Sequence, residues 1–226
     1  MTDAHCHVSC GVSGIRELII GRDFLGVHPW ETLGSEEVRV RGEEVGAWLE
    51  AELKARPKLG VGEIGLDRLK ERTISPVMRE VFSAQLKLAC EYQRPVVLHG
   101  AKCWGEVVKE VNFRIGEFSN NRIGGWMLFH GFSRSAGLIP EIVKLGGYIS
   151  VGPAILNDHA VNYRALVKSI PLERLLIETD RTPENAAECP SIVDVLEGAA
   201  KVLGLSPSEL EHITDANLLI FSGVST

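Results

Sequence analysis

Short apolar segments alternate with longer amphipathic segments along most of this chain. One amphipathic segment, which we expect to be helical from about Ser35, places Val45, Trp48, Leu49 and Leu53 on one stripe. Consecutive parallel strands need a long crossover, usually a helix, so this alternation predicts a parallel α/β sheet. We expect strands at Thr2–Val8, Asp23–His28, Gly60–Leu66, Pro95–His99, Trp126–His130, Tyr148–Val151 and Arg174–Thr179.

The length of 226 residues and about seven or eight such units favour a TIM-like (β/α) barrel, with residues 1–226 forming a single domain. The region Gly14–His28 fits this pattern poorly. Glu17–Gly21 has strand character, but only a couple of residues separate it from the strand expected next, too few for a parallel crossover. We therefore expect a distorted barrel with an abbreviated second βα unit.

Composition narrows the functional classes. No apolar stretch approaches the ~20 residues that span a bilayer, and the N-terminus resembles no secretory signal, so we expect a cytoplasmic protein without membrane association. The five cysteines are scattered and odd in number, which favours reduced thiols and no disulfide-linked partner. The net charge of −6 gives no general footprint for nucleic acid, but bound cations would reverse the local sign around metal-binding carboxylates.

Ionisable residues gather at the ends of the expected strands. His5 and His7 alternate onto one face of the first strand, with Cys6 facing the core, and form half of a metal site. Five of the seven histidines lie at strand ends, where the side chains of a barrel converge on its active face. The strand-end set is His5, His7, His28, Glu63, His99, His130, Glu178 and Asp180.

Glu63 is the candidate bridge between two metal ions, because glycines flank it and leave room for close approach. A bridging carboxylate holds two cations roughly 3.5–4 Å apart. The expected cofactor is two divalent cations, with Mg²⁺, Mn²⁺ and Zn²⁺ as candidates. The alternative is a buried, hydrogen-bonded polar network, which is costly to bury without cations.

Six short motifs follow one another along the chain: Asp3-Ala4-His5-Cys6-His7, Gly26-Val27-His28-Pro29, Gly62-Glu63-Ile64-Gly65-Leu66-Asp67, Pro95-Val96-Val97-Leu98-His99, His130-Gly131-Phe132-Ser133 and Glu178-Thr179-Asp180. In this order they resemble the TatD-like metal-dependent hydrolases, a family of (β/α) barrel phosphodiesterases and nucleases within the amidohydrolase group. A closing motif at Asn217–Phe221 extends the resemblance. By that resemblance, His5, His7, Glu63 and Asp180 hold one metal, and Glu63, His99 and His130 hold the other.

The resemblance implies metal-dependent phosphodiester hydrolysis, with DNA as substrate and cleavage from a 3′ end. Asp180 is then the catalytic carboxylate that accepts a proton from the attacking water, and Glu63 is the second catalytic carboxylate. Asp3 alternates onto the face of His5 and is expected to orient a histidine.

Substrate contacts are less defined. The family carries an arginine two residues after the histidine matched by His99, but this chain has Ala101 there, and Lys102 is the nearest cation. A lysine contacts phosphate as a point charge, without the bidentate fork of arginine. His28 either contacts a substrate phosphate or packs in its loop.

Three other residues have two interpretations each. Trp30 and Trp104 either stack on a base or pack, and packing is favoured for Trp104, which lies on an apolar helical stripe. Asp67 is either a residue of the site's rim or a solvated loop charge.

Two alternative functions remain open. The same metal cluster would serve an amidohydrolase-type enzyme that cleaves a small amide or ester, and pocket shape would distinguish the two. A non-catalytic metal-binding barrel is the other alternative. The sequence leaves the native metal and the oligomeric state open.

Overall fold

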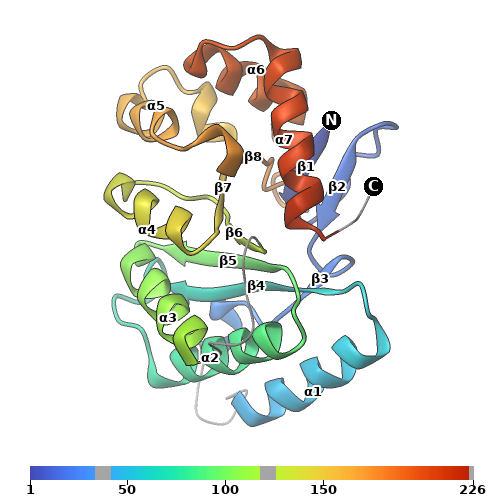
Figure 1. The fold of residues 1–226 in the computed structure, drawn as a ribbon, viewed down its shortest axis with the longest axis vertical. Coiled ribbons are helices and arrows are strands. Elements are labelled where there is room, and N and C mark those ends of the chain that lie inside the picture. Colours follow the sequence, from blue (N-terminus) through green and yellow to red (C-terminus); the bar gives the residue numbers. More distant parts are fainter. Residues whose placement is uncertain (34–41, 118–125, 224–226) are drawn as a thin grey trace.

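A computed structural model describes residues 1–33, 42–117 and 126–223, and it shows parallel strands surrounded by helices (Figure 1). The strands are β1 (Thr2–Cys6), β2 (Arg16–Ile19), β3 (Phe24–Leu25), β4 (Gly60–Asp67), β5 (Val96–Ala101), β6 (Met127–Phe129), β7 (Tyr148–Val151) and β8 (Leu175–Ile177). The helices are α1 (Gly42–Ala55), α2 (Pro76–Glu91), α3 (Trp104–Glu117), α4 (Ile139–Lys144), α5 (Val161–Lys168), α6 (Ile192–Leu203) and α7 (Pro207–Phe221).

The strands follow one another in barrel order. β1 pairs with β2, and β3 to β8 form a six-stranded parallel sheet in sequence order. Backbone bonds also link the β1 end to the segment after β8: Asp180 N–H donates to His5 O (3.0 Å), and His7 N–H donates to Arg181 O (2.8 Å). The fold is therefore a TIM-like α/β barrel, as predicted, although the described strands do not join into one continuous hydrogen-bonded sheet.

The second βα unit is abbreviated, as expected. Only residues 20–23 separate β2 from β3, and β3 has two residues instead of the six expected at Asp23–His28. The chain leaves the sheet early because a 3₁₀ turn, η1 (Pro29–Thr32), begins with proline, and the His28 ring accepts the N–H of Trp30. α1 begins at Gly42 in the described chain, and the expected start near Ser35 lies outside the described residues.

Alternation along the strands builds two apolar layers. Val96 and Leu98 pack outward against the helices, whereas Val97 points into the barrel interior with Leu128 and Leu176. Leu218 and Phe221 of α7 join this interior cluster, and Figure 1 shows α7 beside β1. The interior is thus filled by side chains, which leaves the ends of the strands as the place for a site.

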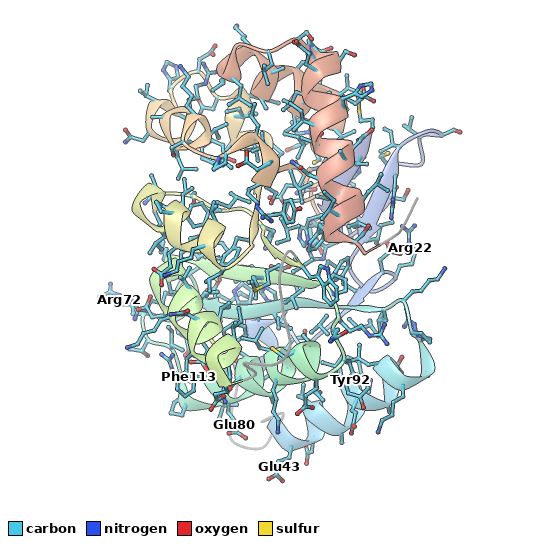
Figure 2. The ribbon with its side chains drawn as sticks, viewed as in Figure 1. Arg22, Glu43, Arg72, Glu80, Tyr92 and Phe113 are labelled. Atoms are coloured by element: carbon cyan, nitrogen blue, oxygen red, sulfur yellow. The ribbon has the colours of Figure 1, made fainter. Side chains whose placement is uncertain are left out.

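The outer helices carry the polar surface. Figure 2 shows Glu43 and Glu80 at the lower edge of the view, on α1 and α2.

Trp104 is buried against Phe129 and Phe132, with ring centroids 5.7 and 5.2 Å away, so it packs as favoured. No helix in the described part of the chain combines the length and apolar character required to span a membrane.

Candidate metal centre

At the end of β1, the imidazoles of His5 and His7 lie close to the same carboxylates. The His5 ring is fully buried and the His7 ring, one residue beyond the strand, is 31% exposed. The Cys6 thiol points the other way, into the core, with Sγ 3.8 Å from Leu18 O. Asp3 accepts the backbone N–H groups of His5 and Thr179, so it holds His5 through the backbone of that residue and not through its ring.

Glu63 lies at the centre of the cluster on β4, whose eight residues are all buried. Two residues after Glu63, Gly65 lets β4 approach β5 closely: a Cβ at Gly65 would lie 2.0 Å from His99 O, and the residue has φ +152°. The two carboxylate oxygens face different partners. We call these two groups of partners the Oε2 half and the Oε1 half.

The Oε2 half consists of His5, His7 and Asp180. Glu63 Oε2 lies 3.7 Å from His5 Nε2 and 3.5 Å from His7 Nε2. Asp180 Oδ1 lies 3.4 and 3.7 Å from the same two nitrogens. Donors held about 2.0–2.1 Å from a tetrahedral cation lie roughly 3.3–3.4 Å apart, so this spacing suits ligands around one ion.

The Oε1 half consists of His99 and His130. Glu63 Oε1 lies 2.6 Å from His99 Nδ1 and 2.5 Å from His130 Nε2, which are direct hydrogen bonds. His28 Nε2 lies 3.6 Å from the same oxygen. The nitrogens His99 Nδ1 and His130 Nε2 stand 3.4 Å apart, as ligands around an ion would, but each is closer to Glu63 Oε1 than two ligands of one ion are to each other.

Unpaired nitrogens test whether a cation fits. Within the described residues, neither ring nitrogen of His5 nor Nδ1 of His130 has a hydrogen-bond partner, although all three are buried. A buried polar atom left unpaired costs about 1–3 kcal/mol. Four imidazoles and two carboxylates with such unused donor atoms fit divalent cations, and the structure therefore contains a possible His/Glu/Asp metal site.

The two halves differ in their electrostatics. Burial, assisted by the nearby His130, lowers the pKa of His5 to about 4, so that ring is neutral. Burial also opposes the charge on His130, but the adjacent Glu63 carboxylate outweighs it and raises that pKa to about 10. Burial opposes ionisation of Glu63 too, yet His130 and the hydrogen bonds from the imidazoles hold its pKa well below the usual range.

Two carboxylates support the Oε1 half, and sequence reasoning did not assign them there. Asp67 is 1% exposed, and its Oδ2 lies 2.7 Å from His99 Nε2, so it is neither a residue of the rim nor a solvated charge. Its position four residues after Glu63 on one strand was the available signal, because such residues share a face. Glu178 is buried beside His130, bonded to Ser150 Oγ and Gly131 N–H.

The candidate substrate residues lie around this cluster. The His28 ring is 4.6 Å from the His99 ring, which places it against the Oε1 half. Trp30 is 40% exposed and carries Lys70 Nζ 3.9 Å over its ring. Lys102 is exposed and lines a hollow together with His99 and Asp180.

Comparison with known proteins assigns the family. A family model described as TatD related DNase matches residues 21–221. The chain belongs to this family. It is 32% identical over 213 residues to the uncharacterized metal-dependent hydrolase YabD of Bacillus subtilis, covering 89% of this chain and 78% of that protein. The TatD resemblance predicted from the motifs is confirmed.

Further comparisons agree with this family. The chain is 27% identical over 213 residues to the 3′-5′ ssDNA/RNA exonuclease TatD of Citrobacter rodentium, covering 88% of this chain and 76% of the relative. The crystal structure of the TatD homologue YjjV of Escherichia coli superposes with a TM-score of 0.77 at 23% identity, covering 99% and 98% of the two chains, which shows the shared fold. This TatD-family chain is accordingly a metal-dependent hydrolase.

Proposed function

We propose that this TatD-family hydrolase is a phosphodiesterase that degrades DNA from its 3′ end, using two divalent cations at the Glu63 cluster. The observation that carries the proposal is the division of one buried carboxylate between two sets of imidazoles. A carboxylate divided in this way is placed to bridge two cations, the arrangement on which two-metal hydrolysis depends. The printed activity of the Citrobacter relative, a 3′-5′ exonuclease on single-stranded DNA and RNA, supports the choice of substrate.

Each half would hold one cation. His5, His7, Asp180 and Glu63 Oε2 are the proposed ligands of the first, and His99, His130 and Glu63 Oε1 those of the second. Nitrogen-rich donor sets favour Zn²⁺ or Mn²⁺ over Mg²⁺, although bound water would complete a site for Mg²⁺.

The residues of the chain have distinct tasks in the proposed reaction. Bound cations would supply Lewis acidity for water attack and for the negative charge on the phosphoryl oxygens. Asp180, whose side chain is 47% exposed, reaches the open side of the cluster and would accept the proton of the attacking water. His28 and Lys102 would contact the phosphate oxygens, His28 from the Oε1 side and Lys102 from the adjoining hollow.

The test is hydrolysis by metal-reconstituted protein. The substrates are 3′- and 5′-labelled single-stranded DNA, RNA and bis-p-nitrophenyl phosphate. We expect Glu63→Ala and Asp180→Asn to reduce activity by at least about 10²-fold, because a group in direct contact with the cation should matter at least as much as its supporting partners. Glu173→Gln, an exposed carboxylate near the opposite end of β8, is the matched control.

Two outcomes would contradict the proposal. Unchanged hydrolysis by both site variants would remove the cluster from catalysis. Activity on small amides or carboxylic esters alone, with no cleavage of any phosphodiester, would favour the amidohydrolase alternative.

A further inference from the structure

Two hollows open on either side of Asp180. One, of about 660 Å³, is lined by His99, Lys102 and Trp104 and is called here the β5 hollow. The other, of about 860 Å³, is lined by Pro153 and Tyr163 and is called the β7 hollow. Both volumes fall within the 300–1,000 Å³ typical of ligand sites.

The two hollows share one boundary. Gly131, Ser133, Arg134 and Asp180 line both, so the segment after β6 forms the divide between them. Arg134 is the cation common to both hollows. It directly follows the His130-Gly131-Phe132-Ser133 motif and was not assigned a role from the sequence.

The backbone at Arg134 is unusual. It has φ +63°, a left-handed conformation that is uncommon outside glycine. Among the described residues, the other non-glycine residues with positive φ are Gln93, Lys102 and Asp180. Three of these four thus surround the same cluster, and such conformations concentrate at functional sites.

The guanidinium of Arg134 is available to a ligand. Arg134 is exposed, and it forms no ion pair with any residue that the structure describes. Besides Asp180, the carboxylate that lines the β5 hollow is Glu106, which is already paired with Arg68 at 2.6 Å. Arginine offers a planar fork that binds two phosphate oxygens at once, which Lys102 does not.

We propose that Arg134 binds the phosphate adjacent to the scissile one in a single-stranded oligonucleotide, with the neighbouring nucleotides lying in the β5 and β7 hollows. This inference rests on the proposed phosphodiesterase function. Arg134 then supplies the bidentate phosphate contact that position 101, an alanine, does not provide. Arg134 therefore raises the affinity for substrates long enough to carry a second phosphate, whereas the Glu63 cluster cleaves the scissile bond.

The sharpest variant is Arg134→Gly, because glycine adopts φ +63° without strain and removes only the side chain. We expect KM for an eight-nucleotide DNA to rise about 10-fold, as for loss of a charged hydrogen bond. Hydrolysis of bis-p-nitrophenyl phosphate, which has no adjacent phosphate, should stay unchanged. With chelator present to prevent cleavage, fluorescence anisotropy should show weaker binding and a salt slope smaller by about 0.7.

Two variants serve as controls. Gln93→Gly places glycine at another position with positive φ, away from the cluster. It should change neither KM for the oligonucleotide nor hydrolysis of bis-p-nitrophenyl phosphate. Arg134→Lys keeps the positive charge but lacks the bidentate guanidinium. Its salt slope should equal that of the unmodified protein, and its affinity should lie between those of the unmodified protein and Arg134→Gly.

The outcomes separate the two proposals. Equal KM and equal salt slope for Arg134→Gly and the unmodified protein would overturn the role of Arg134 while phosphodiesterase activity stands. Equal loss on the oligonucleotide and on the small diester would also overturn it, by showing a merely structural effect. Failure of the unmodified protein to cleave either substrate would instead refute the proposed function.

Discussion

The two oxygens of Glu63 face surroundings of opposite character. In the Oε2 half, donor atoms stand 3.4–3.7 Å apart and the buried His5 is neutral. In the Oε1 half, His99 and His130 close directly onto the carboxylate at 2.5–2.6 Å, and His130 carries a proton. The donor atoms of the first half are spaced for an ion, whereas those of the second are close enough to hydrogen-bond directly to the carboxylate.

The two halves come from different parts of the barrel. His5, His7 and Asp180 come from the β1 end and the segment after β8, which backbone hydrogen bonds join. His99 and His130 come from the ends of the neighbouring strands β5 and β6, which backbone hydrogen bonds also join, and Asp67 holds the far nitrogen of His99. A cation that enters the Oε1 half must replace the hydrogen bonds between these imidazoles and Glu63 Oε1.

The largest expected effect comes from removing one ligand from each half. His7→Asn and His99→Asn should each lower the metal content of reconstituted protein from two ions per chain to one, and lower kcat by at least about 10²-fold. Metal binding measured by calorimetry in buffers of different ionisation enthalpy should be accompanied by proton release in His7→Asn. This variant retains the Oε1 half, which contains His130 with its raised pKa. For His99→Asn, any proton released should come from His7, whose pKa is raised by its hydrogen bond to Glu63, because His5 is already neutral.

An exposed histidine on α7 supplies the control, since His212→Asn should bind two ions. A single ion in the unmodified protein, lost equally in both variants, would show that the halves form one mononuclear site.

A smaller effect is expected for Asp67→Asn. The carboxylate bonded to His99 Nε2 orients that ring, and loss of such a partner typically weakens metal affinity 10–100-fold. Titration should show this loss at the Oε1 half alone, with the Oε2 half unchanged. Asp158→Asn, an exposed carboxylate, is the control. Equal weakening of both halves would argue that Asp67 supports the whole cluster.

The smallest effect is the pH response of the metal-free protein. The pKa of His130 is raised from 6.5 to about 10, so its stabilising contribution is complete below pH 6.5 and is lost as pH rises toward 10. The pKa of His5 is lowered from 6.5 to about 4, so stability is lost as pH falls from 6.5 through 4. NMR titration of the imidazoles and Tm measured against pH in chelator would test both.

His130→Gln separates the two contributions. It should lose the alkaline decrease in Tm and keep most of the acid one, because burial is the main cause of the lowered pKa of His5 and His130 is the second. An alkaline decrease of unchanged size would place the responsible proton elsewhere.

Much of this arrangement was predictable from the chain. The period of two along a strand places His5 and His7 on one face, and the convergence of strand ends in a barrel brings Glu63, His99 and His130 toward them. The abbreviated second unit was also foreseeable, because the residues between β2 and β3 are too few for a helix. These are local constraints of spacing and chain length.

Other features depended on contacts between distant segments. Asp67 is buried against His99 because β4 and β5 pair in the register Gly65 to His99, and spacing in one strand does not set that register. Arg134 stands between two hollows because the loops after β5, β6 and β7 meet beside Asp180.

The sequence by itself therefore determined which residues can ligate a metal and at which end of the barrel they gather, since side-chain chemistry and strand period are local properties. The tertiary structure alone decided how the oxygens of Glu63 are divided, which half is spaced for an ion, and which cation lines both hollows beside Asp180. Distances of a few tenths of an ångström and the burial that shifts each pKa arise only when strands and loops far apart in the chain pack together.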